Sequence, residues 1–197
     1  ALQTVKSAKD MFFPFQEDIM KFHMDGKKIS VEAAKKKDTD FVVFGVRACD
    51  ARSFSILDKV FLADPVDTYY QARREHGTVV SMACHRPEET CFCSTFGIDA
   101  TKPEGDVVTW IAQDTLYWEA QTEKGQALTE KVSAVLAESD TAAVEAQQAA
   151  VKEILQKLPL ADLDLSYFTS HPELEIFKRP EWAELSSHCL GCGTCTF

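Results

Sequence analysis

Seven cysteines fall into two groups whose spacing is typical of metal or cluster ligands. The first group is Cys49, Cys84, Cys91 and Cys93, and the second group is Cys189, Cys192 and Cys195. An odd number of cysteines cannot pair completely in disulfides, and the spacings C-x6-C-x-C and C-x2-C-x2-C suit ligation better than bridging. We therefore expect thiolate ligands in a reducing compartment, and hence a cytoplasmic protein.

The first group depends on two buried strands to bring its members together. The apolar run FVVFGV at 41–46 predicts a strand that is buried on both faces, and TVVSMA at 78–83 predicts a second. Between them, 51–62 and 66–76 have the composition and period of helices. The order strand, helical crossover, strand indicates a βαβ unit with parallel strands.

Parallel strands end at the same edge of a sheet, where open α/β folds form ligand sites. Cys49 and Cys84 follow the two strands, and the loop after Cys84 contains Cys91 and Cys93. We expect these four thiolates to converge on one 4Fe–4S cluster; a 2Fe–2S cluster or a structural zinc ion has the same kind of ligand set. A helix beginning nearby would direct N–H groups at the cluster, and Arg47 would add a charged contact.

Other interpretations of the first group are open. A single buried cysteine at a strand end is commonly an apolar filler, which is a plausible role for Cys49 or Cys84 alone. Cys91 and Cys93 could instead form a catalytic dithiol, which requires a depressed thiol pKa. The sequence has no Ser/His/Asp or paired-carboxylate constellation and no G-x-G-x-x-G after a strand, so we assign no catalytic residue and expect no dinucleotide on this chain.

The second group matches the first three positions of the ferredoxin pattern C-x2-C-x2-C-x3-C-P. Gly191 and Gly193 would let the backbone curl around a cluster. No fourth cysteine follows, so we expect a partial site whose remaining ligand lies outside this chain. A three-iron cluster or zinc is the alternative. Because the chain begins with Ala1, without an apolar signal segment, and ends within a ligand motif, we expect it to be a fragment of a longer protein.

The remaining segments predict a mixed sheet with flanking helices. Residues 11–24 suggest a short amphipathic helix after Pro14, and 106–113 and 115–122 suggest an antiparallel hairpin. Residues 125–158 are rich in alanine, glutamate and glutamine and predict surface helices with one break.

The expected fold class is therefore α/β, with a small mixed, partly parallel sheet, a βαβ unit and flanking helices, followed by the start of a ferredoxin-like module. We divide the chain into an α/β domain that carries the cluster (1–158), a connecting segment (159–188) and the truncated start of the module (189–197).

Charge and hydropathy exclude two classes of partner. The 197 residues have a formal net charge of −10 and a pI near 5.0, which argues against nucleic acid binding. No apolar run approaches the roughly 20 residues of a membrane span, so we expect no membrane insertion.

Four stretches resemble a known family of iron–sulfur subunits. They are FGVRACDARSFSILDKVF, DTYYQARRE, SMACHRPEETCFCSTFG and RPEWAELSSHCLGCGTCT, and the likeness spans residues 11–197. The chain is similar to the iron–sulfur electron-transfer subunits of sulfhydrogenase (its β subunit) and of anaerobic sulfite reductase, which are 4Fe–4S dicluster proteins.

The resemblance implies that residues 45–50 form a G-V-R-x-C-D turn, that residues 91–93 belong to a C-x6-C-F-C loop, and that the terminal cysteines start a ferredoxin module. It also implies a non-catalytic subunit that relays electrons between a flavin/NAD(P)H-binding partner and a catalytic subunit of hydrogenase or sulfite/sulfur reductase type. The alternative is a zinc-stabilised structural or interaction domain without a redox role.

Overall fold

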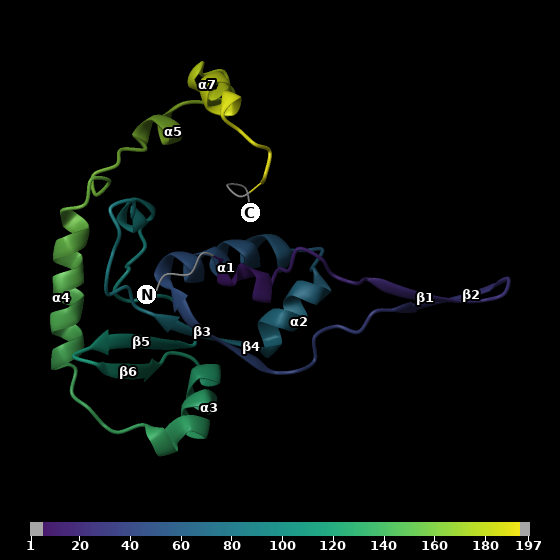
Figure 1. Ribbon diagram of the computed structural model, residues 1–197, viewed down its shortest axis with the longest axis horizontal. Helices are drawn as coiled ribbons and strands as arrows, with labels where there is room; N and C mark the ends of the chain where they lie inside the picture. Colours follow the sequence, from purple (N-terminus) through teal and green to yellow (C-terminus); the bar gives the residue numbers. More distant parts are fainter. Residues whose placement is uncertain (1–5, 194–197) are drawn as a thin grey trace. The chain divides into compact units, whose positions relative to one another are not determined.

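The computed structural model describes residues 6–193, and the chain divides into two compact units, 1–161 and 162–197 (Figure 1). The first unit contains a four-stranded sheet in the order β3-β4-β5-β6, in which β3, β4 and β5 run parallel and β6 pairs antiparallel with β5. The strands are β3 (Phe41–Arg47), β4 (Gly77–Met82), β5 (Val107–Ala112) and β6 (Thr115–Ala120). The predicted small mixed, partly parallel sheet is confirmed.

The predicted βαβ unit is also confirmed. Strand β3 leads directly into α1 (Ala48–Phe61), and α2 (Thr68–His76) follows before β4, which pairs parallel with β3. Asp67 begins α2 because its carboxylate accepts hydrogen bonds from the backbone N–H groups of Tyr69 and Tyr70, both 3.0 Å long. The two strands that precede the first cysteine group are therefore direct neighbours.

An aromatic core fills the space between this sheet and its helices. Phe12, which follows the short helix η1 (Ala8–Met11), is fully buried, and its ring centroid lies 5.5 Å from that of Phe41 and 4.8 Å from that of Phe54. The guanidinium of Arg74 lies 5.1 Å from the Phe12 ring and pairs with Asp58 at 2.8 Å. The Asp58 carboxylate also accepts a 2.7 Å hydrogen bond from the Tyr70 hydroxyl. Residues before the first strand of this sheet thus complete the core between β3, α1 and α2.

The sequence correctly predicts the β5–β6 hairpin. Three further helices of the first unit flank it. They are α3 (Glu123–Val132), the short η3 (Ser133–Val135) and α4 (Ala142–Gln156), so the predicted break in the helical region 125–158 is present. On β5, the Trp110 indole N–H donates to the carbonyl of Thr101 at 2.8 Å. This bond ties the end of the cysteine-containing loop to the sheet.

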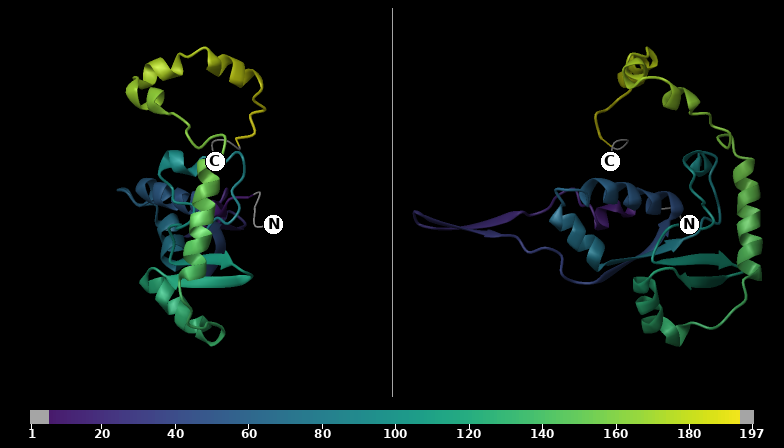
Figure 2. Two further views of the ribbon diagram at one scale, coloured as in Figure 1. Left: turned by 90° about the vertical axis from the view of Figure 1, so that its left-hand side faces the viewer. Right: turned by 180° about the vertical axis from the view of Figure 1, so that it is seen from behind.

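A second sheet is a separate two-stranded hairpin, β1 (Met20–Asp25) and β2 (Lys28–Ala33). It extends away from the four-stranded sheet within the first unit (Figure 2). The predicted helix after Pro14 is wrong. Alternating apolar residues pair across the two strands, and Gly26, with a φ of 58°, allows the two-residue connection between Asp25 and Lys28.

The second unit is described by three short helices: α5 (Ser166–Ser170), α6 (Glu173–Phe177) and α7 (Glu181–Ser187). All three helices lie within 159–188, the segment that the sequence analysis expects to connect two domains. Cys195 and the end of the predicted ferredoxin motif lie outside the described residues.

Candidate metal centre

The four cysteines of the first group come from three neighbouring pieces of the first unit. Cys49 is the second residue of α1, directly beyond β3, and Cys84 lies two residues beyond β4. The loop after Cys84 contains Cys91 and then Cys93, which begins the short helix η2 (Cys93–Phe96). Cys84 is fixed by a 2.8 Å hydrogen bond from its N–H to the carbonyl of Ala100. The parallel pairing of β3 and β4 thus brings the two strand ends to one edge, as the sequence predicts.

These thiols are near enough to one another that the charge of one thiolate would raise the pKa of another. Cys93 interacts with Cys49, Cys84 and Cys91, and Cys84 interacts with Cys49 and Cys91. The same two thiols that follow the strands, Cys49 and Cys84, also interact with the charge of Arg47. All six described cysteines are free thiols. In the fold, the members of the first group therefore lie within electrostatic range of one another, and Arg47 lies within range of Cys49 and Cys84.

The surroundings of the first cysteine group disfavour ionisation of its thiols while no cation is bound. Burial raises the pKa of Cys93 to about 11, and the neighbouring thiols Cys49, Cys91 and Cys84 add to the shift. Burial likewise raises the pKa of Cys84 and of Cys49, and in Cys49 the Asp50 carboxylate reinforces it. A catalytic dithiol needs the opposite shift, so this geometry argues against that interpretation.

Backbone N–H groups nevertheless face the sulfur atoms. The Glu88 N–H donates to Cys91 Sγ at 3.3 Å, and the Arg86 backbone forms a hydrogen bond that lowers the pKa of Cys84 against the larger effect of burial. At the N-terminus of α1, the backbone groups of Cys49 and Asp50 act on the Cys49 thiol in the same way. N–H donors around sulfur are typical of cysteines that bind a metal as thiolates.

Two polar atoms beside the group have no hydrogen-bond partner. Of the four buried side-chain atoms without such a partner in the part of the chain that the structure describes, two are Arg47 Nε and Thr95 Oγ1, and the other two are the carboxylate oxygens of Asp10. Arg47 is the N-cap residue of α1, two positions before Cys49, and Thr95 lies two positions after Cys93. An unpaired buried donor is costly, so both positions favour a bound group that accepts hydrogen bonds. The sequence indicates Arg47 but contains no signal for Thr95.

The ligand type of the first group suits an iron–sulfur cluster and a zinc ion alike. Within residues 6–193, no three His, Cys, Asp or Glu side chains are placed closely enough to hold one metal ion. Four cysteine thiolates are the ligand set of a 4Fe–4S cluster and also of a structural zinc ion. Four interacting thiols with donors beside them are thus compatible with an iron–sulfur cluster.

A bulge in β3 sets the direction in which the chain enters this site. The register between β3 and β4 shifts between Phe44 and Val46, and Gly45, between them, has a φ of 85°. A Cβ atom at Gly45 would meet no atom within 4 Å, so the glycine is required by backbone conformation and not by space.

Gly45→Ala is expected to destabilise the fold by about 1–2 kcal/mol, because a residue with a Cβ is strained at positive φ. It should also lower the iron content of anaerobically purified protein, because the bulge places Arg47 and Cys49. Urea unfolding and iron analysis test the two effects. Gly26→Ala, with a φ of 58° in the distant β1–β2 turn, is the control and should leave iron content unchanged. Equal iron loss in both variants would contradict a positioning role for the bulge.

The pKa of Cys93 predicts how the metal-free protein reacts with iodoacetamide. Only the thiolate reacts, so at pH 8 Cys93 in the folded protein should label about a hundredfold more slowly than in unfolded protein, where a thiol pKa is about 8.5. The labelling rate of folded protein should rise with pH up to about 11. Mass spectrometry of the labelled peptide measures both rates. Rapid labelling below neutral pH would instead support a catalytic dithiol.

The second group is only partly described. Cys189 and Cys192 are exposed, and the N–H of Gly191 donates to Cys189 Sγ at 3.3 Å. Gly191 and Gly193 have φ values of 66° and 74°, so both adopt the left-handed conformation expected for a tight curl. The local backbone agrees with the predicted motif, while Cys195 is outside the described residues.

Comparison with known proteins identifies a relative. Over 167 residues, the chain is 34% identical to sulfhydrogenase 2 subunit beta of Pyrococcus furiosus. The aligned part is 81% of this chain and 47% of the relative, so the chain spans about half the length of the curated relative it matches. Over this aligned part, the chain is similar to a sulfhydrogenase β subunit.

This similarity to a sulfhydrogenase β subunit confirms the resemblance drawn from the four sequence stretches. No protein-family profile matches the chain. No solved structure matches it either. Across residues 6–193 of the chain, no helix is both long and apolar enough to cross a membrane.

Three surface cavities of the protein have no cysteine in their lining. One, of about 420 Å³, lies at the root of the β1–β2 hairpin, and another, of about 240 Å³, lies beside the Asp58–Arg74 pair. The candidate metal centre is therefore a set of converging thiols and not one of these cavities.

Proposed function

We propose that this protein is a non-catalytic iron–sulfur electron-transfer subunit, in which Cys49, Cys84, Cys91 and Cys93 bind one 4Fe–4S cluster. The observation that supports this most strongly is the parallel pairing of β3 and β4, which places Cys49 and Cys84 beyond neighbouring strand ends and next to the loop that contains Cys91 and Cys93. The similarity to a sulfhydrogenase β subunit is further support.

The protein's own groups are suited to hold such a cluster. Arg47 is positioned to offset the negative charge of thiolate ligands and has a free Nε–H donor, and Thr95 has a free hydroxyl. The N–H of Glu88 and the first turn of α1 would stabilise the thiolate forms of Cys91 and Cys49. A bound cluster supplies reversible one-electron transfer.

The wider organisation is also part of the proposal. Residues 1–158 would carry the cluster, 159–188 would connect, and 189–197 would begin a ferredoxin-like module, with Cys189, Cys192 and Cys195 as a partial second site. The subunit would work in the cytoplasm between a flavin/NAD(P)H-binding partner and a catalytic subunit of hydrogenase or sulfite/sulfur reductase type. The name of the relative, a β subunit of a sulfhydrogenase, supports a place in a multi-subunit enzyme.

The test is the metal and acid-labile sulfide content of anaerobically purified protein, together with its visible absorption spectrum. We expect about four irons and four sulfides per chain and a brown protein. About one zinc without sulfide would refute the cluster and support a zinc-stabilised structural domain, which should then unfold with a chelator.

A further inference from the structure

The β1–β2 hairpin exposes a continuous apolar face. Because its strands pair in a fixed register, every residue pair on one face is apolar. The exposed fractions of its five large side chains lie between 59% and 73%. The pairs are Met20 with Ala33, Phe22 with Val31, and Met24 with Ile29. A clustered apolar face of this kind, unlike scattered exposed residues, indicates an interaction site.

The opposite face and the flanks of the hairpin are polar and basic. The polar cross-strand pairs are Lys21 with Glu32, His23 with Ser30, and Asp25 with Lys28. Residues 20–37 contain six lysines and two carboxylates, a net charge of +4, in a chain whose net charge is −10. The hairpin and its C-terminal flank are therefore a basic segment of an acidic protein, and they favour acidic surroundings on whatever covers the apolar face.

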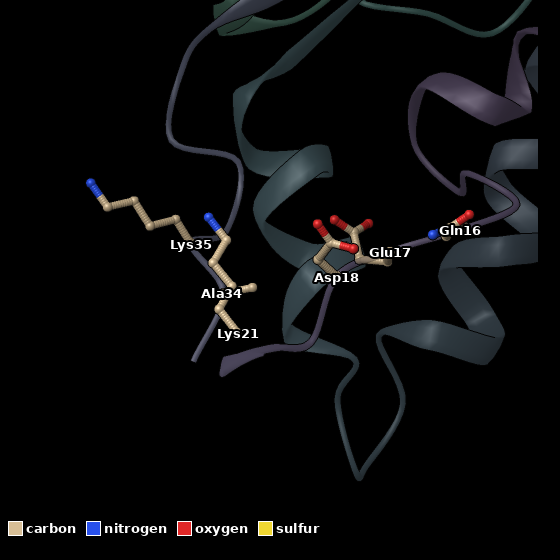
Figure 3. Close-up of a pocket in the computed structure, with 6 residues that line it drawn as sticks. All are labelled: Gln16, Glu17, Asp18, Lys21, Ala34 and Lys35. Atoms are coloured by element: carbon tan, nitrogen blue, oxygen red, sulfur yellow. The ribbon is translucent and has the colours of Figure 1, made fainter. Parts of the chain in front are cut away.

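The root of the hairpin is fixed to helix α2. The Tyr69 hydroxyl donates to the carbonyls of Ile19 at 3.1 Å and Ala34 at 3.3 Å, so it bonds both strands where they leave the core. Arg73 holds Glu17 with hydrogen bonds of 2.7 to 3.0 Å. Figure 3 shows Glu17 and Asp18 in the pocket at this root, with Lys21 and Lys35 on its other side. The hairpin is thus anchored at its base and is presented as an arm.

We propose that the β1–β2 hairpin is a docking arm for another protein, whose surface has an apolar strip bordered by carboxylates. Phe22 and Val31 lie at the centre of the apolar face and would be buried by that strip, while Lys27 and Lys28 at the tip meet the carboxylates. A two-stranded hairpin has little stability of its own in water, so burial of one face also stabilises the arm.

Two other possible partners of the arm, a second copy of this chain and a membrane, fit its positive charge less well. In a second copy of this chain, two arms with a net charge of +4 would meet face to face and repel each other. An extended anionic membrane would repel the rest of the acidic protein, whereas a local acidic rim on a protein meets only the arm. This inference concerns a contact surface and does not depend on the proposed cluster.

The test compares the full-length protein with its F22S/V31S variant, each purified with the partner chains that it retains. We expect the variant to bind the partner of the wild-type protein at least about tenfold more weakly, because central apolar residues dominate such contacts. Hydrogen exchange should show residues 20–33 protected in the wild-type complex. The tip variant K27E/K28E, which leaves the apolar face intact, should also weaken binding and reduce its dependence on salt.

The control is H23S/S30A, which changes one cross-strand pair on the opposite, polar face and should retain wild-type affinity. Unchanged partner affinity in F22S/V31S would overturn the proposal, as would the absence of any retained partner in wild-type preparations. Two further outcomes would also overturn it: flotation with vesicles of phosphatidylcholine and phosphatidylglycerol that F22S/V31S abolishes, or a dimer in sedimentation equilibrium that F22S/V31S dissociates. Because every readout is binding, these results stay separate from iron content.

Discussion

Replacing Cys91 with serine is expected to reduce iron and sulfide from about four of each per chain to near zero in anaerobically purified protein. Serine lacks the soft sulfur that iron–sulfur clusters require. The sulfur of Cys91 also accepts a hydrogen bond from the Glu88 N–H. The substitution therefore removes a proposed ligand whose sulfur already has a backbone donor beside it. The loss should be visible as bleaching of the brown colour, and iron and sulfide assays measure its size.

The matched control is Cys192→Ser, which changes a cysteine in the partial second site. It is expected to alter iron content little in this chain, because the cysteines of that site cannot complete a cluster without a fourth ligand. Far-UV circular dichroism should show that both variants remain folded. Equal iron loss in the two variants would refute the assignment of a complete site to the first cysteine group alone.

Phe12→Ala is expected to reduce the free energy of unfolding by about 3–5 kcal/mol, because it removes a fully buried ring and leaves a cavity. The ring packs on Phe41 of β3 and Phe54 of α1, and the Arg74 guanidinium lies over it. All three neighbours belong to the βαβ unit that ends at the cysteine site. Urea unfolding of metal-free protein, followed by circular dichroism, measures the loss.

Phe15→Ala provides the control within the same segment. Phe15 is 73% exposed, and its ring lies 5.8 Å from Lys6 Nζ, so its removal should change stability by no more than about 0.5 kcal/mol. A loss in Phe15→Ala as large as that in Phe12→Ala would contradict the burial of Phe12 as the source of its effect.

Much of the sheet can be predicted from local pattern because each signal is strong and short in range. The apolar run at 41–46 is β3, the segment before Gly77 is α2, and the two extended segments around Asp114 are β5 and β6. The spacing of the cysteines likewise indicates two separate groups of candidate ligands. These features depend on hydrophobic period and on residue chemistry, both of which are present in the order of residues itself.

The β1–β2 hairpin is not predicted, although a local signal for it exists. Met20, Phe22 and Met24 alternate with polar residues before Asp25-Gly26, which is the pattern of a strand followed by a tight turn. The prediction of a short amphipathic helix after Pro14 assigns these apolar residues to a helix and is wrong, because they lie on a strand. The exposure of the hairpin's apolar face also differs from the usual case, in which such a face packs on its own domain.

The order of residues was enough to specify which side chains are available to bind a cluster and that two parallel strands precede Cys49 and Cys84. The three-dimensional packing was needed to show that β3 and β4 are neighbours, that all four thiols of the first group interact, and that Arg47 and Thr95 leave donors unpaired beside them. The physical reason is the distance along the sequence over which each effect acts. Hydrophobic period and ligand spacing act over a few residues, whereas these interactions involve positions as far apart as Cys49 and Cys93, which affect each other only after the sheet has paired and the core has packed.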